Sequence, residues 1–252
     1  MNKVIHGDCL EVMPTIPGKS IDMILCDLPY GTTACKWDTI IPLEPLWKEY
    51  KRLIKDNGAI VLTASQPFTT VLINSNIAMF KYEWCWDKGN CTGYMMAKYQ
   101  PMKQHENILV FGRGRVNYNP QMELLKKGDY RIRRTRNRTR EGPEVYGGQK
   151  VRDEIVEYKD VRYPKSIIYF ASNMKNVNRL HPTQKPVALF EYLIKTYTNE
   201  GETVLDNCAG SGTTAIACIN TNRNYILIEK EQEYIGIINK RISEHEKQLA
   251  II

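Results

Sequence analysis

Residues 203–229 read TVLDNCAGSGTTAIACINTNRNYILIE, and this stretch decides the fold class. Its apolar start predicts a strand that ends at Asp206, and the glycine turn that follows leads into a predicted helix over 213–220. The apolar run at 225–228 predicts a second strand, which ends at Glu229. A strand, a helix and another strand in this order form the repeating unit of a parallel α/β sheet.

The glycine turn of this stretch also predicts a ligand site. Gly210 and Gly212 let the backbone pass close to a ligand, and the free amides at the start of the helix favour an anion or a polar group. Glu229 follows Asp206 by 23 residues, and an acid at about this spacing binds ribose hydroxyls in nucleotide-binding α/β folds. Ala215 replaces the third glycine of a dinucleotide fingerprint, and no P-loop lysine follows, so a pyrophosphate cofactor is not favoured.

The same alternation of strands and helices continues on both sides of this stretch. Asn57-Gly58 is expected to end the first long helix. The expected elements are strands at 21–26, 59–63 and 108–111, and helices at 43–55, 187–197 and 231–249. The pattern predicts one α/β domain with a mostly parallel sheet, built from residues 1–112 and 166–252.

Composition limits the class of protein. The chain has 252 residues, of which 42% are apolar and 25% are charged, as in an ordinary soluble globular protein. It contains no apolar stretch of the roughly 18 residues that a membrane helix needs and no signal peptide at the start. Its seven cysteines include no Cys-x-x-Cys pair, and its four histidines are far apart, which argues against a metal site and against a disulfide framework. We therefore expect a soluble protein of a reducing cytoplasm.

The segment between the two parts of the predicted domain, residues 113–165, is strongly basic. Residues 113–140 alone hold ten lysines and arginines against Glu123 and Asp129, so they carry more positive charge than the whole chain, whose net charge is +7. A local excess of this kind is typical of a nucleic-acid contact. We interpret 113–165 as a target-recognition insertion, with DNA contacts expected at Arg131, Arg133, Arg134, Arg136 and Arg138.

A second candidate site follows the predicted strand at 21–26. That strand ends in Asp27-Leu28-Pro29-Tyr30, and open α/β sheets bind their ligands at strand ends. Pro29 stiffens the turn, which offers a carboxylate, a free backbone carbonyl and an aromatic face. These groups suit the amino group of a flat base, which needs acceptors and a stacking surface.

Four motifs together resemble the β group of DNA amino-methyltransferases. Asp27-Leu28-Pro29-Tyr30 resembles the family's Asp/Asn/Ser-Pro-Pro-Tyr catalytic motif in a looser form. The other three motifs are Gly7-Asp8, the segment His181-Pro182-Thr183-Gln184-Lys185-Pro186, and the glycine motif over 206–214. The catalytic motif, a variable basic region and the cofactor motifs follow one another in the order typical of that group, and the resemblance covers most of the chain.

The resemblance implies a Rossmann-like class I S-adenosylmethionine-dependent methyltransferase fold, a sheet with a small inserted target-recognition region. The implied cofactor is S-adenosylmethionine, released as S-adenosylhomocysteine. Asp8 would bind the adenine amino group of the cofactor, Glu229 its ribose, and Thr183 and Lys185 its methionine carboxylate. The full set of implied cofactor residues is Asp8, Thr183, Gln184, Lys185, Asp206, Ala209, Gly210, Ser211, Gly212, Thr213 and Glu229.

The resemblance also implies the reaction. The target base would leave the duplex, Tyr30 would stack on it, and Asp27 and Pro29 would accept its amino protons. Aspartate in the first motif position is typical of adenine N6 enzymes, whereas serine is typical of cytosine N4 enzymes, so we expect adenine. An RNA or protein amino-methyltransferase and a non-catalytic DNA-binding protein remain the alternatives.

Double-stranded DNA is the expected partner, with no membrane involved, and the expected location is the cytoplasm of a bacterial or phage-infected cell. The resemblance leaves open a homodimer and a cognate restriction endonuclease.

Overall fold

A computed structural model describes residues 2–31, 39–125, 161–172 and 184–250, together with the backbone at 140–141 and 150–151. The chain forms two compact units. The first unit joins Met1–Asn119 to Lys165–Ile252, and the second is Pro120–Pro164.

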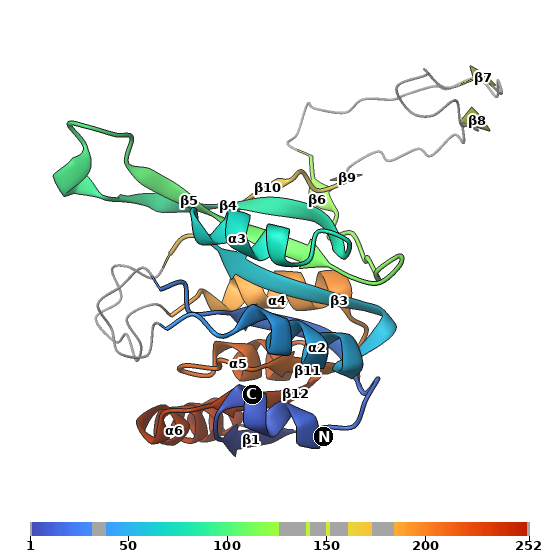
Figure 1. Cartoon of the computed structure of the whole chain (residues 1–252), viewed down its shortest axis with the longest axis vertical. Coiled ribbons are helices and arrows are strands. Elements are labelled where there is room, and N and C mark those ends of the chain that lie inside the picture. The colour runs from blue at the N-terminus through green and yellow to red at the C-terminus, as the bar shows by residue number, and fades with distance from the viewer. Residues whose placement is uncertain are drawn as a thin grey trace. The chain divides into compact units, whose positions relative to one another are not determined.

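An eight-stranded sheet is the framework of the first unit (Figure 1). Its strands from one edge to the other are β1 (Lys3–His6), β12 (Asn224–Glu229), β11 (Thr203–Asp206), β2 (Ile21–Asp27), β3 (Ile54–Ala64), β5 (Lys103–Phe111), β4 (Phe80–Thr92) and β10 (Ile167–Tyr169). The strands from β1 to β3 are parallel to their neighbours. Strand β5 runs antiparallel to both β3 and β4, and β10 is parallel to β4. The prediction of a mostly parallel α/β sheet is therefore confirmed.

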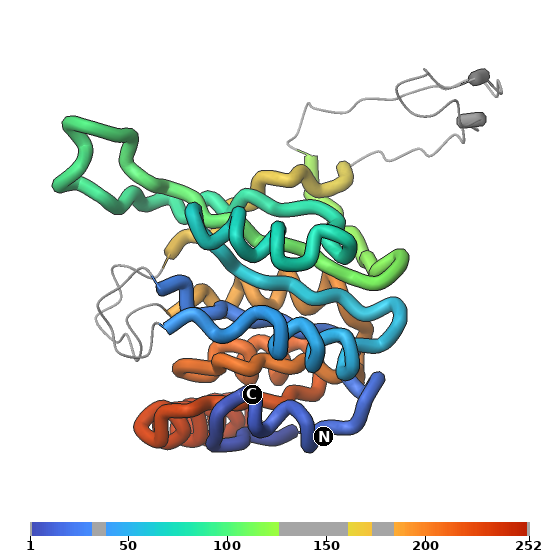
Figure 2. Tube along the Cα trace, in the orientation of Figure 1, coloured from blue at the N-terminus to red at the C-terminus, as the bar shows by residue number. Residues whose placement is uncertain are grey.

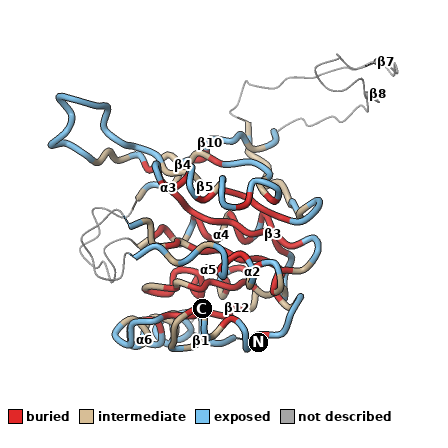
Figure 3. Tube along the Cα trace, in the orientation of Figure 1, coloured by how far each residue is buried: buried red, intermediate tan, exposed pale blue. Residues whose placement is uncertain are grey.

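Helices cover both faces of this sheet, and Figure 2 follows the chain through the two layers. One core contains buried side chains of α1 (Cys9–Val12), η1 (Met13–Thr15), α2 (Leu43–Leu53) and α3 (Phe68–Ser75). The other contains those of α4 (Val187–Tyr197), α5 (Thr213–Asn220) and α6 (Gln232–Leu249). Strand β2 supplies both cores, because Ile24 and Cys26 face one layer while Met23 and Leu25 face the other. The most buried part of the tube is accordingly the sheet between the layers (Figure 3).

The apolar periodicity located several elements closely. The helices predicted at 187–197 and 213–220 are α4 and α5, and the strand predicted at 21–26 is β2 with Asp27 added at its end. These segments are apolar at nearly every core-facing position, so their sequence pattern fits only one type of secondary structure. Strands β1 and β4 and helix α3 were not expected.

The expected end of the helix at 43–55 is wrong. Helix α2 ends at Leu53, and β3 begins at the next residue, where Ile54 pairs with Ile21. Asn57-Gly58 therefore lies inside β3, at an irregularity in its pairing with β2. Gly58 is needed there for close approach, because a Cβ atom would lie 2.7 Å from the backbone oxygen of Asp22.

The second unit contains two short antiparallel pairs. Strand β6 (Glu123–Leu124) pairs with β9 (Val161–Arg162), and β7 (Arg140–Glu141) pairs with β8 (Lys150–Val151). Arg162 Nε donates to Glu123 Oε2 at 2.7 Å across the first pair. The arginines expected to bind DNA, Arg131, Arg133, Arg134, Arg136 and Arg138, lie outside the described residues.

The compact unit Pro120–Pro164 is shorter than the insertion expected at 113–165. Asn117 N donates to Asn57 O at 2.9 Å, and Asn119 N donates to Thr196 O at 2.7 Å. These bonds attach the start of the basic segment to the first unit. In the described part of the chain, no helix combines the length and the apolar character needed to cross a membrane.

Candidate active site

A cavity of about 790 Å³ opens where the parallel strands of the first unit end. Asp27 ends β2, Asp206 ends β11 and Glu229 ends β12, so the sheet brings three carboxylates from distant sequence positions to one edge. The predicted site residues that line the cavity are Asp8, Asp27, Pro29, Tyr30, Gln184, Lys185, Asp206, Ala209, Gly210, Ser211, Thr213 and Glu229. Its volume lies within the roughly 300–1,000 Å³ typical of sites for small molecules.

Two predicted residues stand apart from this lining. Gly212 is the residue before α5 and contacts the core side of the turn, where a Cβ atom would lie 3.1 Å from Ile238. Thr183 lies outside the described residues.

Asp27 is held in the cavity by hydroxyl groups on one of its oxygens. Tyr30 donates its hydroxyl to Asp27 Oδ1 at 2.8 Å, and Thr63 Oγ1 makes a short hydrogen bond to the same oxygen. Thr63 is the register partner of Asp27 on β3, so the sheet itself places this donor. The Tyr30 ring stacks on Phe68 with the ring centroids 5.3 Å apart. Burial raises the pKa of Tyr30, which keeps its hydroxyl a hydrogen-bond donor.

The other oxygen of Asp27 is paired with a lysine that is 158 residues away in sequence. Lys185 Nζ lies 2.7 Å from Asp27 Oδ2 and 3.4 Å from Glu106 Oε2. Burial alone would lower the pKa of Lys185, but the carboxylates of Asp27 and Glu106 outweigh it and raise that pKa. The Lys185 ammonium is therefore a permanent positive charge beside Asp27.

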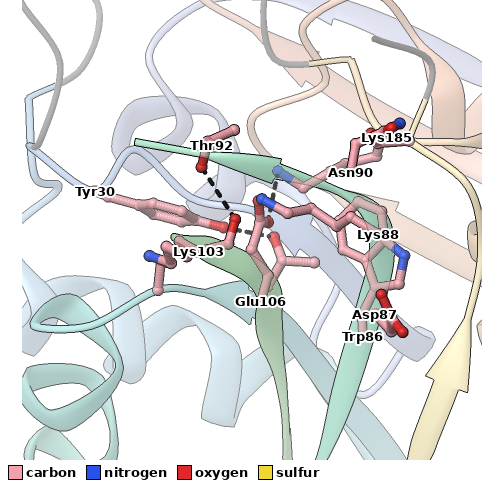
Figure 4. Close-up of polar contacts among 12 residues, drawn as sticks. Tyr30, Trp86, Asp87, Lys88, Asn90, Thr92, Lys103, Glu106 and Lys185 are labelled. Carbon is pink, nitrogen blue, oxygen red and sulfur yellow. Dashed lines mark hydrogen bonds and ion pairs between the residues drawn. The ribbon is translucent and has the colours of Figure 1, made fainter. Parts of the chain in front are cut away.

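Glu106 connects this pair to a second lysine. Lys88 on β4 and Glu106 on β5 extend toward each other from neighbouring strands, with Lys88 Nζ 3.1 Å from Glu106 Oε1 (Figure 4). Burial opposes ionisation of Glu106, yet Lys185 and Lys88 hold its pKa below the ordinary value. Two lysines and two carboxylates thus form a charge-balanced cluster, which we call the lysine–carboxylate cluster: Asp27, Lys88, Glu106 and Lys185.

The sequence analysis missed Lys88 and Glu106. Both line the cavity, together with Trp86, Thr92 and Lys103 from the same two strands. The alternation of Trp84, Trp86 and Lys88 was the available signal, because residues two apart share one face of a strand.

The opposite end of the cavity holds carboxylates without lysine partners. Asp206 accepts a short hydrogen bond from Thr214 Oγ1 and one from Cys208 N at 3.1 Å. Burial raises the pKa of Asp206 to about 7. Among the described residues, no lysine or arginine forms an ion pair with it.

Glu229 is held in the same way, by backbone amides. Gly210 N donates to Glu229 Oε2 at 2.7 Å, and Glu231 N donates to Oε1 at 2.9 Å. Burial raises the pKa of Glu229. The bond from Gly210 connects the glycine turn to the end of the next strand, and it depends on the left-handed backbone at Gly210, whose φ is 51°.

Asp8 begins the short helix α1 at the edge of this region. Its Oδ1 accepts from Leu10 N at 3.0 Å, and Lys230 Nζ lies 3.1 Å from Oδ2. The amide of Leu10 contributes most to lowering the pKa of Asp8.

Gln184 gives this cavity an unused acceptor. Its buried side-chain oxygen Oε1 has no hydrogen-bond partner within the part of the chain that the structure describes. A buried acceptor without a partner is unfavourable, so a donor on a bound molecule would stabilise it. The cavity thus combines this acceptor, two carboxylates without cations and a glycine turn.

Comparison with known proteins agrees with this geometry. A family model described as DNA methylase matches residues 21–240. The DNA adenine methyltransferase YhdJ of Escherichia coli (strain K12) is 29% identical over 254 residues, which cover 95% of this chain and 82% of that protein.

Two solved structures share the fold. The crystal structure of an M1.HpyAVI-SAM complex has a TM-score of 0.62 and 24% identity to this chain. The match covers 96% of this chain and 100% of that chain. The PvuII DNA methyltransferase, described as cytosine-N4-specific, has a TM-score of 0.66 and 14% identity, covering 98% of this chain and 92% of that chain. The fold expected from the sequence motifs is therefore confirmed.

Proposed function

Because this chain belongs to the DNA methylase family of N6 and N4 amino-methyltransferases, we propose that it transfers a methyl group from S-adenosylmethionine to the N6 amino group of adenine in double-stranded DNA. One observation carries the proposal. The Asp27 turn and the glycine turn before α5, which are 180 residues apart in sequence, line one cavity. A methyl donor and an acceptor amino group must meet in such a place.

S-adenosylmethionine, when bound, supplies a methyl group on a positively charged sulfur. The residues present fit it. Asp206 and Glu229 offer carboxylates held only by neutral donors, and Gln184 offers a buried acceptor without a partner among the described residues. A cation with several hydrogen-bond donors suits this set.

The cofactor roles remain those expected from the motifs. Asp8 binds the adenine and Glu229 the ribose, while Asp206 and the glycine turn with Gly210 and Gly212 lie on the methionine and ribose side. Thr183 and Lys185 hold the methionine carboxylate. An ammonium has three donors, so Lys185 keeps its bond to Asp27 while it serves this second role.

At the other end of the cavity, Asp27 and the Pro29 carbonyl accept hydrogen bonds from the two N–H groups of the flipped base. Tyr30 stacks on the base and also fixes the Asp27 carboxylate through its hydroxyl. Accepting these hydrogen bonds orients the nitrogen lone pair toward the donor end of the cavity. The protein thereby contributes mainly position and orientation.

Aspartate at position 27 and the resemblance to a named DNA adenine methyltransferase support adenine as the target. Nucleoside mass spectrometry tests this on unmethylated double-stranded DNA incubated with the protein and S-adenosylmethionine. N6-methyladenine is the expected product, and N4-methylcytosine would contradict the choice of base while leaving the family unchanged. The Asp27→Ala protein, which should form neither product, is the control.

Contacts of Arg131, Arg133, Arg134, Arg136 and Arg138 with DNA are part of the proposal, as is the target-recognition role of the basic segment at 113–165. The charge of that segment supports both. A homodimer, a cognate restriction endonuclease and a cytoplasmic location stay predictions. No modified base in DNA, with cofactor binding intact, would redirect the search to an RNA or protein substrate.

A further inference from the structure

The hairpin formed by β4 and β5 projects from the sheet and ends in a tip, residues 93–102 (Figure 1). At its neck, Thr92 pairs with Lys103, and Thr92 Oγ1 donates to the Lys103 backbone oxygen at 3.3 Å. Both residues line the cavity. The tip therefore starts at the mouth of the site that the target base must enter.

The tip exposes large apolar side chains. Met95 is 95% exposed, Tyr99 is 81% exposed and Tyr94 is 71% exposed. Isolated exposed apolar residues are ordinary, but a group of them on one projecting turn marks a contact surface.

The tip is nevertheless a defined turn. Gly93 takes the left-handed backbone, with φ 88°, and starts the single turn η2 (Tyr94–Met96). Ala97 N donates to Tyr94 O at 3.2 Å, and Tyr99 N donates to Met96 O at 2.9 Å. The backbone thus presents Met95 at the end of the hairpin in a fixed conformation.

The charge around the tip favours a nucleic acid as the partner. The tip itself, residues 93–102, contains Lys98 and no aspartate or glutamate, and Lys103 follows it at the neck. Apolar side chains flanked by lysines suit a surface that combines stacked bases with phosphates. A contact between two apolar protein surfaces would not require that aspartate and glutamate be absent from the tip.

Taking a base out of the duplex leaves a gap that unstacks its neighbours. Proteins that deform DNA insert apolar side chains between base steps, which replaces part of the lost stacking. We propose that the hairpin tip enters duplex DNA beside the target base, with Met95 filling the gap and Tyr94 and Tyr99 contacting the neighbouring bases. This inference rests on the proposed function, since it concerns how the base reaches Asp27.

The test compares methyl transfer on two duplexes that carry the target sequence identified with the unaltered protein. In one, the target base is correctly paired, and in the other it is opposite a mismatched base and leaves the stack more easily. The variant Tyr94→Ala/Met95→Ala/Tyr99→Ala should be at least about tenfold slower on the paired duplex and within about threefold of the unaltered protein on the mismatched one. All three side chains are exposed, so the fold should persist.

A matched control is Ile77→Ala. Ile77 is 64% exposed and does not line the cavity, so its loss should leave both rates unchanged. Fluorescence of 2-aminopurine at the target position gives a second readout, because a flipped base is no longer quenched by stacking on its neighbouring bases. The tip variant should lower that emission at saturating protein.

Three results would overturn the inference. One is an equal loss of methyl-transfer rate on the two duplexes, and another is no loss of rate on either duplex. The third is a change in sedimentation of the tip variant without DNA, which would assign the surface to a second copy of the chain. If the unaltered protein modifies no DNA base, the proposed function fails first; if it does and the tip variant behaves identically, only the inference about the tip fails.

Discussion

The two ends of the cavity hold their carboxylates in opposite ways. At the Asp27 end, each carboxylate of the lysine–carboxylate cluster contacts a lysine, and the pKa of Glu106 is lowered. At the glycine-turn end, Asp206 and Glu229 are held by hydroxyl, thiol and backbone amide groups, all neutral donors, and their pKa values are raised. The lysine–carboxylate cluster at the first end already has no net charge. The second end has carboxylates without a cation, so a cationic ligand would favour their ionised form, and the two ends suit two different molecules.

The largest effect should come from the first end. Asp27→Ala removes the carboxylate proposed to accept a hydrogen bond from the target amino group, so methyl transfer should fall by about three orders of magnitude. Cofactor affinity, measured by calorimetry, should change little, because Lys185 and the other residues proposed to hold the cofactor are all retained. Asp56→Ala, at a carboxylate whose side chain is 70% exposed, is the control and should leave activity unchanged. Retained turnover in the Asp27→Ala protein would contradict the proposed difference in function between the two ends of the cavity.

The second prediction concerns pH and the opposite end. The folded pKa of Asp206, about 7, is above its ordinary value of 3.8. The carboxyl is therefore easier to protonate in the folded protein, and the protein without cofactor should lose stability as pH rises from 4 to 7. Asp206→Asn removes the ionisation, so its free energy of unfolding relative to the unaltered protein should increase by roughly 2–3 kcal/mol between pH 5 and pH 8.

Urea unfolding at the two pH values measures this difference. The Asn side-chain oxygen can accept from Cys208 N while its NH2 group donates to the Thr214 hydroxyl, which makes the change mainly one of charge. A constant difference across the pH range would mean that Asp206 ionises normally and that the contrast between the ends is absent.

A smaller effect is expected inside the lysine–carboxylate cluster. Glu106→Gln removes one negative charge, so Lys185 is attracted by Asp27 alone and competes more strongly for the oxygen that the target base needs. The maximal turnover rate should fall by about tenfold, with little change in the KM for the cofactor. A raised KM for the cofactor with unchanged turnover would instead place Glu106 in the cofactor end.

The smallest effect tests the glycine turn. Gly212→Ala places a Cβ atom 3.1 Å from Ile238 on a backbone with φ 77°, so it should lower the free energy of unfolding by about 1 kcal/mol. Gly236→Ala is the matched control, because Gly236 lies within α6 with no atom within 4 Å of the added Cβ. It should stabilise the protein by up to about 1 kcal/mol. Thermal unfolding of both variants shows whether each substitution lowers or raises the stability of the protein.

The comparison also explains how far the sequence could predict the site. The Asp27 and Asp206 ends are each a short continuous motif at a strand end, so local patterns located them. The lysine–carboxylate cluster joins residues from β2, β4, β5 and the segment before α4, and only the sheet order brings these together. No local pattern contains that information.

The fold shows the same limit. Helices α4 and α5 have buried residues at most positions and were predicted with correct ends. Strand β4 carries lysines, acids and glycine among its aromatic residues, which hides its apolar alternation. Asn57-Gly58 had the composition of a turn, yet its role is to let β3 pass close to Asp22.

The antiparallel direction of β5 relative to its neighbours has a consequence for how the chain can change in evolution. Parallel neighbours must be joined by a crossover that returns the chain to the opposite edge, whereas the antiparallel pair β4 and β5 is joined directly at the edge that carries the cavity. An insertion or deletion between these two strands lengthens or shortens the connection without altering any strand's partner or register. A change in that connection would therefore alter residues next to the cavity while leaving the strands that end in Asp206 and Glu229 in place.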